Sequence, residues 1–405
     1  MVEVTAKAEI TREQVTIGPG SPWRRLPLVG AVLAVVGLGA TAALAGGQAR
    51  QLYFSYLVAF LFFLSLALGG LFFVLVQHAS RSGWSVVVRR IAEDVMGTLP
   101  IFIVLFIPVA VGVHSLFHWS HADAVQSDAL LRGKAPYLNT TFFYIRAAVF
   151  LATWSGLAWW YRRLSVRQDE SGDPQLTRRL QVASGPAIVA YGVTQTFASF
   201  DWAMSLDPHW YSTMYGVYFF AGSAVGIYAL LGLLVAALDR SGLLGDAVTT
   251  EHFHDIGKMI FAFVCFWAYI AFSQYLLQWY ANIPEETVWY LERWKGAWKQ
   301  ASVLLAVGHF PIPFFFLLPR TIKRSTRAVV LAAVWVLVMH YLDLYWLVMP
   351  SLHPHWAHLS PLDLTTFVGV GGVFLAALGW LLRRGALVPI RDPRLAESLR
   401  FENNL

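Results

Sequence analysis

The residues best suited to chemistry in this sequence are ionisable side chains that lie within strongly apolar stretches. A charged side chain at the centre of a lipid bilayer costs about 2.5–3.5 kcal/mol on insertion scales, so each one requires a partner, water or a task. Carboxylates and imidazoles in such positions can exchange protons, because burial moves their pKa values toward the working range. The candidates for a proton pathway are Asp201, Asp343, His340, Arg146, Lys258, Tyr269 and His309.

Two aspartates are central to this set. Asp343 follows His340 by three residues, so on a helix the two side chains share a face and can hydrogen-bond directly or through water. Asp201 shares a helical stripe with Tyr191 and Thr194. We interpret the two aspartates and His340 as a proton relay, with Arg146 as the positive charge that sets their pKa values. The alternative is structural: both carboxylates lie at span ends or are neutralised by Arg146 and Lys299.

Lys258 and Tyr269 belong to the long stretch 252–286. From Ile256 to Ala281 it has more than the roughly 20 residues that a membrane-crossing helix needs. Six residues recur there at steps of three or four and share one helix face. We expect this face to look inward, either as a proton- or ligand-lined surface or as a packing stripe of small residues. The six residues are Asp255, Lys258, Ala262, Cys265, Tyr269 and Ser273.

Histidines and the single cysteine limit the possible cofactors. Cys265 is the only cysteine, which excludes intrachain disulfides, covalent c-type haem and cysteine-ligated iron–sulfur clusters within this chain. His114 and His340 are the one pair that could ligate a b-type haem. Histidines beside tryptophans in interfacial loops are more typical of an aromatic belt than of a metal site, so no metal is predicted. The loop histidines are His118, His121, His209, His353, His355 and His358.

The composition places these residues in a polytopic membrane protein. Hydrophobic residues make up 57% of the 405 residues and charged residues 13%, with a mean hydropathy of +0.55. The net charge of +6 is spread over loops, so nucleic acid is not an expected partner, and membrane lipid is. We predict an all-α fold with a tail at 1–25, a ten-helix membrane domain at 26–382 and a second tail at 383–405. The ten predicted spans are 26–47, 51–77, 97–118, 140–163, 184–203, 213–238, 256–282, 297–318, 328–350 and 362–382.

The basic residues predict the orientation of these spans. The two tails and the loops on their side, with Arg162 and Arg163 at the adjoining end of span 140–163, hold 22 Lys and Arg residues, against 5 in the loops on the other side. The positive-inside rule therefore places both termini in the cytoplasm. Arg146, Asp201, Asp343 and His114 then lie in the outer half of the membrane, whereas Lys258 lies at the inner end of its span. The polar residues 1–25 are too long for the charged region of a signal peptide, so we expect a mature tail.

Two polar segments lie between predicted spans, and the first has two interpretations. Residues 84–97, WSVVVRRIAEDVMG, mix valines with four charges, as a helix lying in the membrane interface does. A plain extension of the third span is an equal alternative. The stretch 165–180 contains Gly and Pro breakers and is predicted to be a polar loop.

Internal similarity predicts two related halves, about 51–210 and 213–382. Residues 94–119 align with 255–279, each from an Asp to a Trp, and the following loops both contain Arg-x-Lys. Pro208-His209-Trp210 then matches Pro354-His355-Trp356. Matching spans cross in the same direction, so the repeat is parallel with its pseudo-twofold axis along the membrane normal.

Two long stretches resemble a known family. They are FASFDWAMSLDPHWYSTMYG (197–216) and HDIGKMIFAFVCFWAYIAFSQYLLQWYANIPEE (254–286). Both are similar to the F-type membrane protein of bacterial alternative complex III, a quinol:electron-acceptor oxidoreductase, and to the polysulfide-reductase (NrfD-type) membrane subunits. The resemblance implies two four-helix bundles, and as partners haem and iron–sulfur subunits and a paralogous NrfD-like subunit. It implies proton conduction, structural support or binding of a quinone or quinol, either menaquinone or ubiquinone.

The function predicted from the sequence is thus that of a membrane subunit in a quinol-oxidising electron-transfer complex of the bacterial plasma membrane. It carries no redox centre of its own, and its expected role is proton translocation, quinone binding or both. Two alternatives remain from other classes. One is a stand-alone secondary transporter, for which Pro311 and Pro313 supply a helix break. The other is a b-haem membrane anchor.

Overall fold

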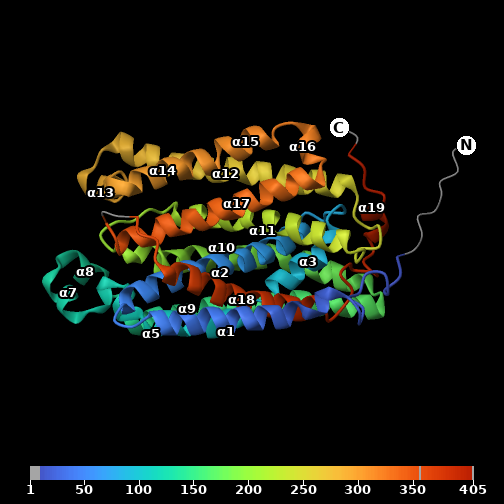
Figure 1. The fold of residues 1–405 in the computed structure, drawn as a ribbon, viewed down its shortest axis with the longest axis horizontal. Helices are drawn as coiled ribbons and strands as arrows, with labels where there is room; N and C mark the ends of the chain where they lie inside the picture. Colours follow the sequence, from blue (N-terminus) through green and yellow to red (C-terminus); the bar gives the residue numbers. More distant parts are fainter. Residues whose placement is uncertain (1–9, 355–356, 404–405) are drawn as a thin grey trace, which may run out of the picture.

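The computed structural model describes residues 10–354 and 357–403, and within them the chain is helical with no β-strand. Long helices run side by side along the longest axis of the molecule, and the first and last described residues, 10 and 403, lie at the same end of it (Figure 1). We call this end the terminal side and the other end the far side. The all-α prediction is confirmed.

The helix bounds are as follows. The first half contains α1 (Leu26–Leu44), α2 (Ala49–Ala79), α3 (Val86–Met96), α4 (Ile101–Leu105), α5 (Ile107–Val111), α6 (Val113–Leu116), α7 (Ala122–Ser127), α8 (Ala129–Lys134), α9 (Thr140–Ser171) and α10 (Pro174–Trp202). The second contains α11 (Tyr215–Arg240), α12 (Thr250–Ala281), α13 (Pro284–Arg293), α14 (Gly296–His309), α15 (Pro311–Leu317), α16 (Arg320–Lys323), α17 (Thr326–Val348), α18 (Pro361–Leu382) and α19 (Leu395–Leu399). Short 3₁₀ turns are η1 (Pro22–Arg25), η2 (His118–Ser120), η3 (Met204–Leu206) and η4 (Met349–Ser351).

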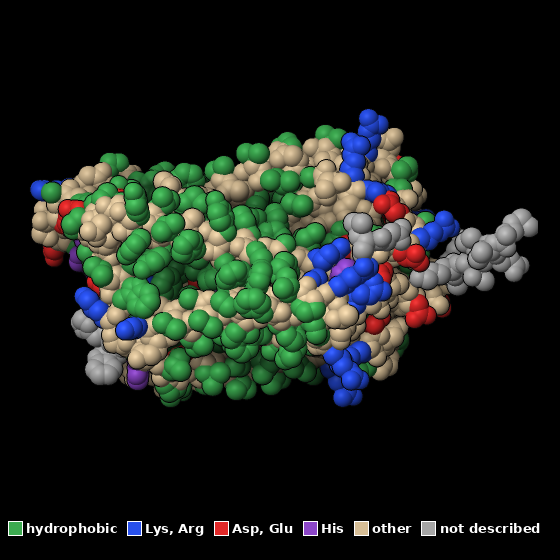
Figure 2. All heavy atoms as spheres, turned by 90° about the horizontal axis from the view of Figure 1, so that it is seen from above, with side chains coloured by type: hydrophobic (Ala, Val, Ile, Leu, Met, Phe, Trp, Pro, Cys, Tyr) green, Lys and Arg blue, Asp and Glu red, His purple; other side chains and the backbone are tan. Residues whose placement is uncertain are grey.

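Helices apolar enough to cross a membrane make this a multi-pass membrane protein. Within the described residues there are 9 such helical segments, one fewer than the ten predicted. The segment that does not qualify is α10, where a span was predicted at 184–203, because Gln195, Asp201 and Pro186 reduce its apolar character. Space-filling atoms show an apolar band between two ends that carry the charged side chains (Figure 2).

The centre of the molecule is α2, which is apolar on all sides and therefore buried on all sides. It packs against α3, α10, α11, α17 and α18. Helices α1 and α18 pair closely at their glycines. A Cβ on Gly30 would lie 2.3 Å from the Ala376 backbone nitrogen, so only glycine permits this approach.

Two spans are interrupted by proline. The break predicted at Pro311 and Pro313 is confirmed, since α14 ends at His309 and α15 begins at Pro311. The Trp335 indole nitrogen donates to the Gly308 carbonyl at 2.7 Å and satisfies a carbonyl oxygen at the break. A second interruption, not predicted, divides α4, α5 and α6 near Pro108 and Gly112.

The charged segment 84–97 does not lie in the membrane interface. The structure supports the alternative, an extension of the third span, because Val86–Val111 is one candidate membrane-crossing segment. All eleven residues of α3 are buried, so this helix lies inside the protein and not at a membrane surface. Arg90 pairs with Glu93 at 2.8 Å and with Asp169 of α9 at 2.7 Å. Arg162 pairs with Asp94 at 2.8 Å. Arg89 pairs with Asp392, which fastens the C-terminal segment to α3.

The predicted loop at 165–180 is also shorter than expected. Helix α9 continues to Ser171 and α10 begins at Pro174, so the chain turns within two residues. Gly172 takes φ 67°, a left-handed conformation that favours glycine, and Asp173 caps α10 by accepting a hydrogen bond from the Gln175 amide. The polar residues around this turn lie on helices, which hydropathy alone did not indicate.

Candidate functional site

Asp343 on α17 is the buried carboxylate with the most unusual surroundings. Asp343 is 1% exposed. One carboxylate oxygen accepts a hydrogen bond from the Tyr218 hydroxyl of α11, and the other accepts from the Trp267 indole nitrogen of α12 at 3.0 Å. Among the described residues no Lys, Arg or His forms a salt bridge with it. Neutral donors alone therefore hold this acid, which lets it gain or lose a proton without breaking an ion pair.

His340 lies one turn earlier on the same helix, and Ser65 of α2 orients its ring. The Ser65 hydroxyl donates to the Phe62 carbonyl at 2.7 Å, so at the 2.7 Å contact with His340 Nε2 the imidazole is the donor. The other ring nitrogen, Nδ1, is buried without a hydrogen-bond partner in the described chain. The sequence predicted a bond between Asp343 and His340. The structure has no direct one, although both side chains pack against Gly222.

Gly222 on α11 provides the space in which these two side chains meet. A Cβ at this position would lie 2.7 Å from His340 Cε1 and 3.9 Å from Asp343 Oδ2. The carboxylate and the imidazole therefore face one small region beside α11. A water molecule that joins His340 Nδ1 to Asp343 would satisfy the unpartnered nitrogen.

His309, the last residue of α14, lies on the other side of Trp267. Its ring stacks on the indole with centroids 3.9 Å apart and planes 21° apart. It is 0% exposed, and neither ring nitrogen has a partner in the part of the chain that the structure describes. Three unpartnered imidazole nitrogens thus surround the Asp343 region. Buried polar groups are nearly always hydrogen-bonded, so this region is expected to hold water.

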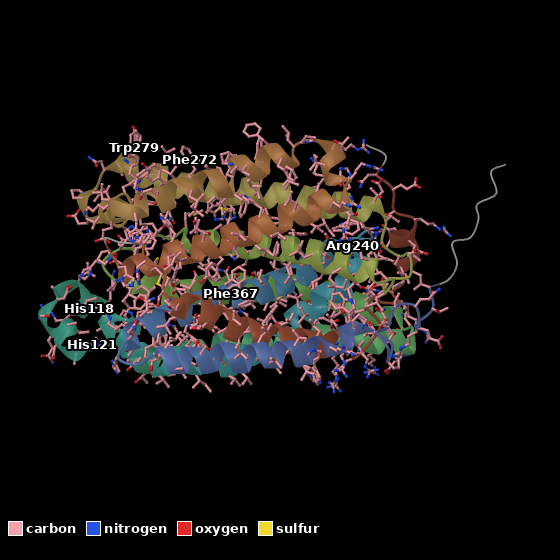
Figure 3. The ribbon with its side chains drawn as sticks, viewed as in Figure 1. His118, His121, Arg240, Phe272, Trp279 and Phe367 are labelled. Carbon is pink, nitrogen blue, oxygen red and sulfur yellow. The ribbon has the colours of Figure 1, made fainter. Side chains whose placement is uncertain are left out.

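A cavity of about 590 Å³ adjoins the site between α12, α13 and α14. Tyr218 and Trp267, the two donors to Asp343, form part of its wall, and the rest is largely aromatic. Phe272, another lining residue, projects from α12 in Figure 3, with Trp279 further along the same helix. The cavity could hold a flat apolar ligand, separated from the carboxylate only by the side chains of Tyr218 and Trp267.

A second cavity of about 750 Å³ is an apolar groove along α18, bounded by α1, α2, α11 and α17. Phe367, labelled midway along α18 in Figure 3, lines it. Asp363 lies at its far-side end, where it accepts hydrogen bonds from the Ser55 hydroxyl at 2.5 Å and the Ser360 amide at 2.8 Å. Asp363 is not among the predicted site residues, although Ser360-x-x-Asp363 is a capping-box pattern that signals a helix start.

Asp201 and Arg146 form a separate, closed ion pair. Arg146 Nε lies 2.6 Å from one oxygen of Asp201, and Nη2 lies 3.0 Å from the other. The guanidinium also donates to the Tyr137 carbonyl at 2.8 Å and lies 3.9 Å from the centroid of the Tyr137 ring. No described contact joins this pair to Asp343 or His340. The structure therefore does not assemble the single relay that the sequence predicted, and Arg146 serves Asp201 alone.

The predicted inward face of α12 is wrong. Tyr269 is 68% exposed, and Ala262 is exposed as well. The buried face consists of Ile260, Val264, Trp267, Ile270 and Gln274. Lys258 lies at the terminal side, where it pairs with Asp255 and donates to Asn403 at 3.1 Å. The predicted face has the right helical spacing but lies on the wrong side of α12. The side that packs against protein carries Trp267 and Gln274, whose polar groups are buried.

The two histidines of the haem alternative lie in different surroundings. His114 is exposed on α6, where Nδ1 contacts the Ser120 hydroxyl, whereas His340 is buried beside Ser65. No contact in the described chain joins the two. His355 and Trp356, which complete the second Pro-His-Trp motif, lie outside the described residues. Tyr218, Trp267 and Ser65 were not predicted as site residues, and nothing in the sequence marks them out from other apolar-helix residues.

Comparison with known protein families and with curated proteins finds no match for this chain.

Proposed function

We propose that this chain is a proton-conducting subunit of a quinol-oxidising electron-transfer complex in the bacterial plasma membrane, with Asp343 as its proton-exchange group. The observation that carries the proposal is the surroundings of Asp343: 1% exposure, two neutral donors and three unpartnered imidazole nitrogens nearby. Groups in a proton path need to titrate, and a carboxylate without a fixed cation can. The choice of a quinol-oxidising complex rests on the resemblance of 197–216 and 254–286 to the F-type membrane protein of alternative complex III.

The proposed arrangement has ten spans, with α10 as the tenth, and both termini in the cytoplasm. The 22 basic residues on one side against 5 on the other support this orientation. The packing of α2 with α3, α9 and α10, and of α11 with α12 and α17, supports two four-helix bundles related by a parallel repeat. Haem and iron–sulfur subunits and a paralogous NrfD-like subunit are the proposed partners. A quinone or quinol is the proposed ligand of the aromatic cavity beside Trp267.

A secondary transporter is the second candidate, and one observation favours it. The break between α14 and α15 places His309 and its unpartnered nitrogens at an interruption in a membrane-crossing segment. Transporters bind substrates and coupling ions at such interruptions. Purification in mild detergent separates the two functions, because a complex subunit brings haem and iron–sulfur chains with it and a transporter does not.

The decisive experiment replaces Asp343 by Asn in the complex, reconstituted in liposomes. Asn keeps the shape of the side chain and cannot exchange the proton, so we expect fewer protons moved per electron while quinol oxidation continues. Asp123→Asn is the matched control, because Asp123 is an exposed far-side carboxylate outside the cluster. A wild-type proton-to-electron ratio in the assembled Asp343→Asn complex would refute the proposal. A collapse of turnover together with quinol affinity would instead assign the site to the substrate.

A further inference from the structure

The far side of the molecule contains a polar hollow of about 480 Å³ that the proposed function does not use. It lies between the start of α2, the segment from α6 to α7, and η4. Three histidines line it, His114, His118 and His121, and two of these are labelled at the far-side end of the molecule in Figure 3. The question is which chemistry these imidazoles present to the hollow.

The hydrogen bonds of His114 determine which of its nitrogens carries the proton. The Ser120 hydroxyl donates its only hydrogen to the Phe117 carbonyl at 2.7 Å. At the 3.0 Å contact with His114 Nδ1 the hydroxyl must then accept, so Nδ1 is the protonated nitrogen. In the neutral ring, His114 Nε2 is left with a free lone pair.

His121 is oriented by the same logic. Its Nε2 lies 2.7 Å from the His114 carbonyl oxygen, which can only accept, so Nε2 carries the proton. The lone pair of the neutral ring is on Nδ1. Neither His114 Nε2 nor His121 Nδ1 forms a hydrogen bond within residues 10–354 and 357–403. Metal-binding histidines are held in this way, with one ring nitrogen donating to a backbone carbonyl or hydroxyl and the other free for the ion.

The spacing of the two rings fits a shared ion. Their centroids are 5.5 Å apart. A tetrahedral ion bound at about 2.0–2.1 Å to one nitrogen of each imidazole holds the two centroids roughly 5–5.5 Å apart. The backbone that carries them is fixed, because Trp119, between the two histidines, is 2% exposed and donates to the Ser205 hydroxyl at 3.1 Å.

We propose that His114 Nε2 and His121 Nδ1 bind a divalent transition-metal ion, Zn²⁺ or Cu²⁺, at this hollow. The described residues contain no group of three His, Cys, Asp or Glu placed to hold a metal, so two imidazoles are the protein ligands and water fills the other positions. Arg50 lines the same hollow, and its positive charge opposes the ion, so the affinity is moderate.

Cu²⁺ is the sharper probe, because imidazole sites bind it most tightly among the common divalent ions and it is paramagnetic. One equivalent added to the detergent-purified full chain should give a pulsed EPR signal from two coordinated imidazoles. His114→Gln and His121→Gln should each reduce this to one imidazole and weaken binding at least tenfold. Ser120→Ala keeps both ligands but frees the His114 ring, so it should weaken binding about tenfold. Arg50→Gln should strengthen binding, which a non-specific surface site would not show.

His353 and His358 provide the matched control. Their rings are 5.8 Å apart, but among the described residues a hydrogen bond orients the ring of His353 alone, through Gln51 at 2.6 Å. His358→Gln should therefore leave the first-equivalent signal unchanged. The proposal is overturned if the wild-type chain shows one imidazole or none, or if His358→Gln removes the signal. The wild-type spectrum decides the matter even if a variant does not fold.

Discussion

Replacing Asp201 and Asp343, two of the buried aspartates, by asparagine, one at a time, should change the stability by very different amounts. Asp201 neutralises Arg146 through two hydrogen bonds of 2.6 and 3.0 Å, and both residues are buried. Removing one partner of a buried ion pair costs about 3–5 kcal/mol, because the other charge is left uncompensated. The Tyr137 carbonyl and ring still contact the guanidinium, which favours the low end. We expect Asp201→Asn to cost about 3 kcal/mol, more than a hundredfold in the unfolding equilibrium.

Asp343→Asn removes no ion pair. In the variant the amide oxygen accepts from Trp267, and the amide NH2 donates to the Tyr218 hydroxyl, which turns to accept. Both bonds change from charge-assisted to neutral, a loss of about 2 kcal/mol in total. The asparagine also escapes the penalty of burying a carboxylate, which is of similar size or larger. We therefore expect a change within about 1 kcal/mol of wild type.

The assay for both variants is reversible unfolding of the purified chain in mixed micelles with increasing SDS, followed by tryptophan fluorescence. Both proteins must start from the same folded state, which size-exclusion chromatography checks. If Asp343→Asn loses about 3 kcal/mol and Asp201→Asn less than about 1 kcal/mol, the assignment of Asp201 to structure and Asp343 to exchange is incorrect.

Two further predictions concern packing and pH. Gly222→Ala places a methyl group 2.7 Å from His340 Cε1, so it should displace the ring from Ser65. We expect a cost of about 1–3 kcal/mol in the same unfolding assay. The control is Gly192→Ala on α10, which should cost nothing because no heavy atom lies within 4 Å of its Cβ. The hydrogen bond from His209 at 2.5 Å lowers the pKa of Asp128, which caps α8. A depressed folded-state pKa contributes stability above the unfolded value of about 3.9 that is lost as pH falls through the folded value. The protection of residues 129–134 against hydrogen exchange, relative to the unfolded chain at the same pH, should therefore fall below about pH 4. In His209→Gln it should fall at a higher pH, and identical profiles would show that the contact contributes nothing.

The sequence predicted the helical class, most span positions and the proline break at Pro311, because long apolar runs and helix breakers act locally. It left open whether α3 lies in the membrane interface or extends the third span. A helix that carries Arg89, Arg90, Glu93 and Asp94 has the composition of a helix at the membrane interface, and only the partners of its charges show that it is buried. Those partners, Asp169 and Asp392, lie about 80 and 300 residues further along the chain. No local pattern contains that information.

The candidate site shows the same limit. Asp343 and His340 were predicted from their helical spacing, and the structure confirms that both are buried. Their contacts are with Tyr218, Trp267 and Ser65, which come from three other helices. These partners are brought together by helix packing. A tyrosine or tryptophan is common in an apolar helix, so its presence in the sequence does not indicate a site. The α12 face was assigned the wrong phase for a related reason, since polarity alone does not tell which side of a helix meets protein.

Charge pairing separates the buried acids of this chain into two groups, and that separation bears on how proton exchange could be driven. Glu93, Asp94, Asp169 and Asp201 each form a salt bridge with an arginine. Asp343 instead depends on a hydroxyl from α11 and an indole from α12. A small shift of α12 would remove the Trp267 bond and, through the stacked His309, alter the break between α14 and α15. Proton affinity at Asp343 would then follow helix position, which is the coupling that a redox-driven or ligand-driven proton step requires.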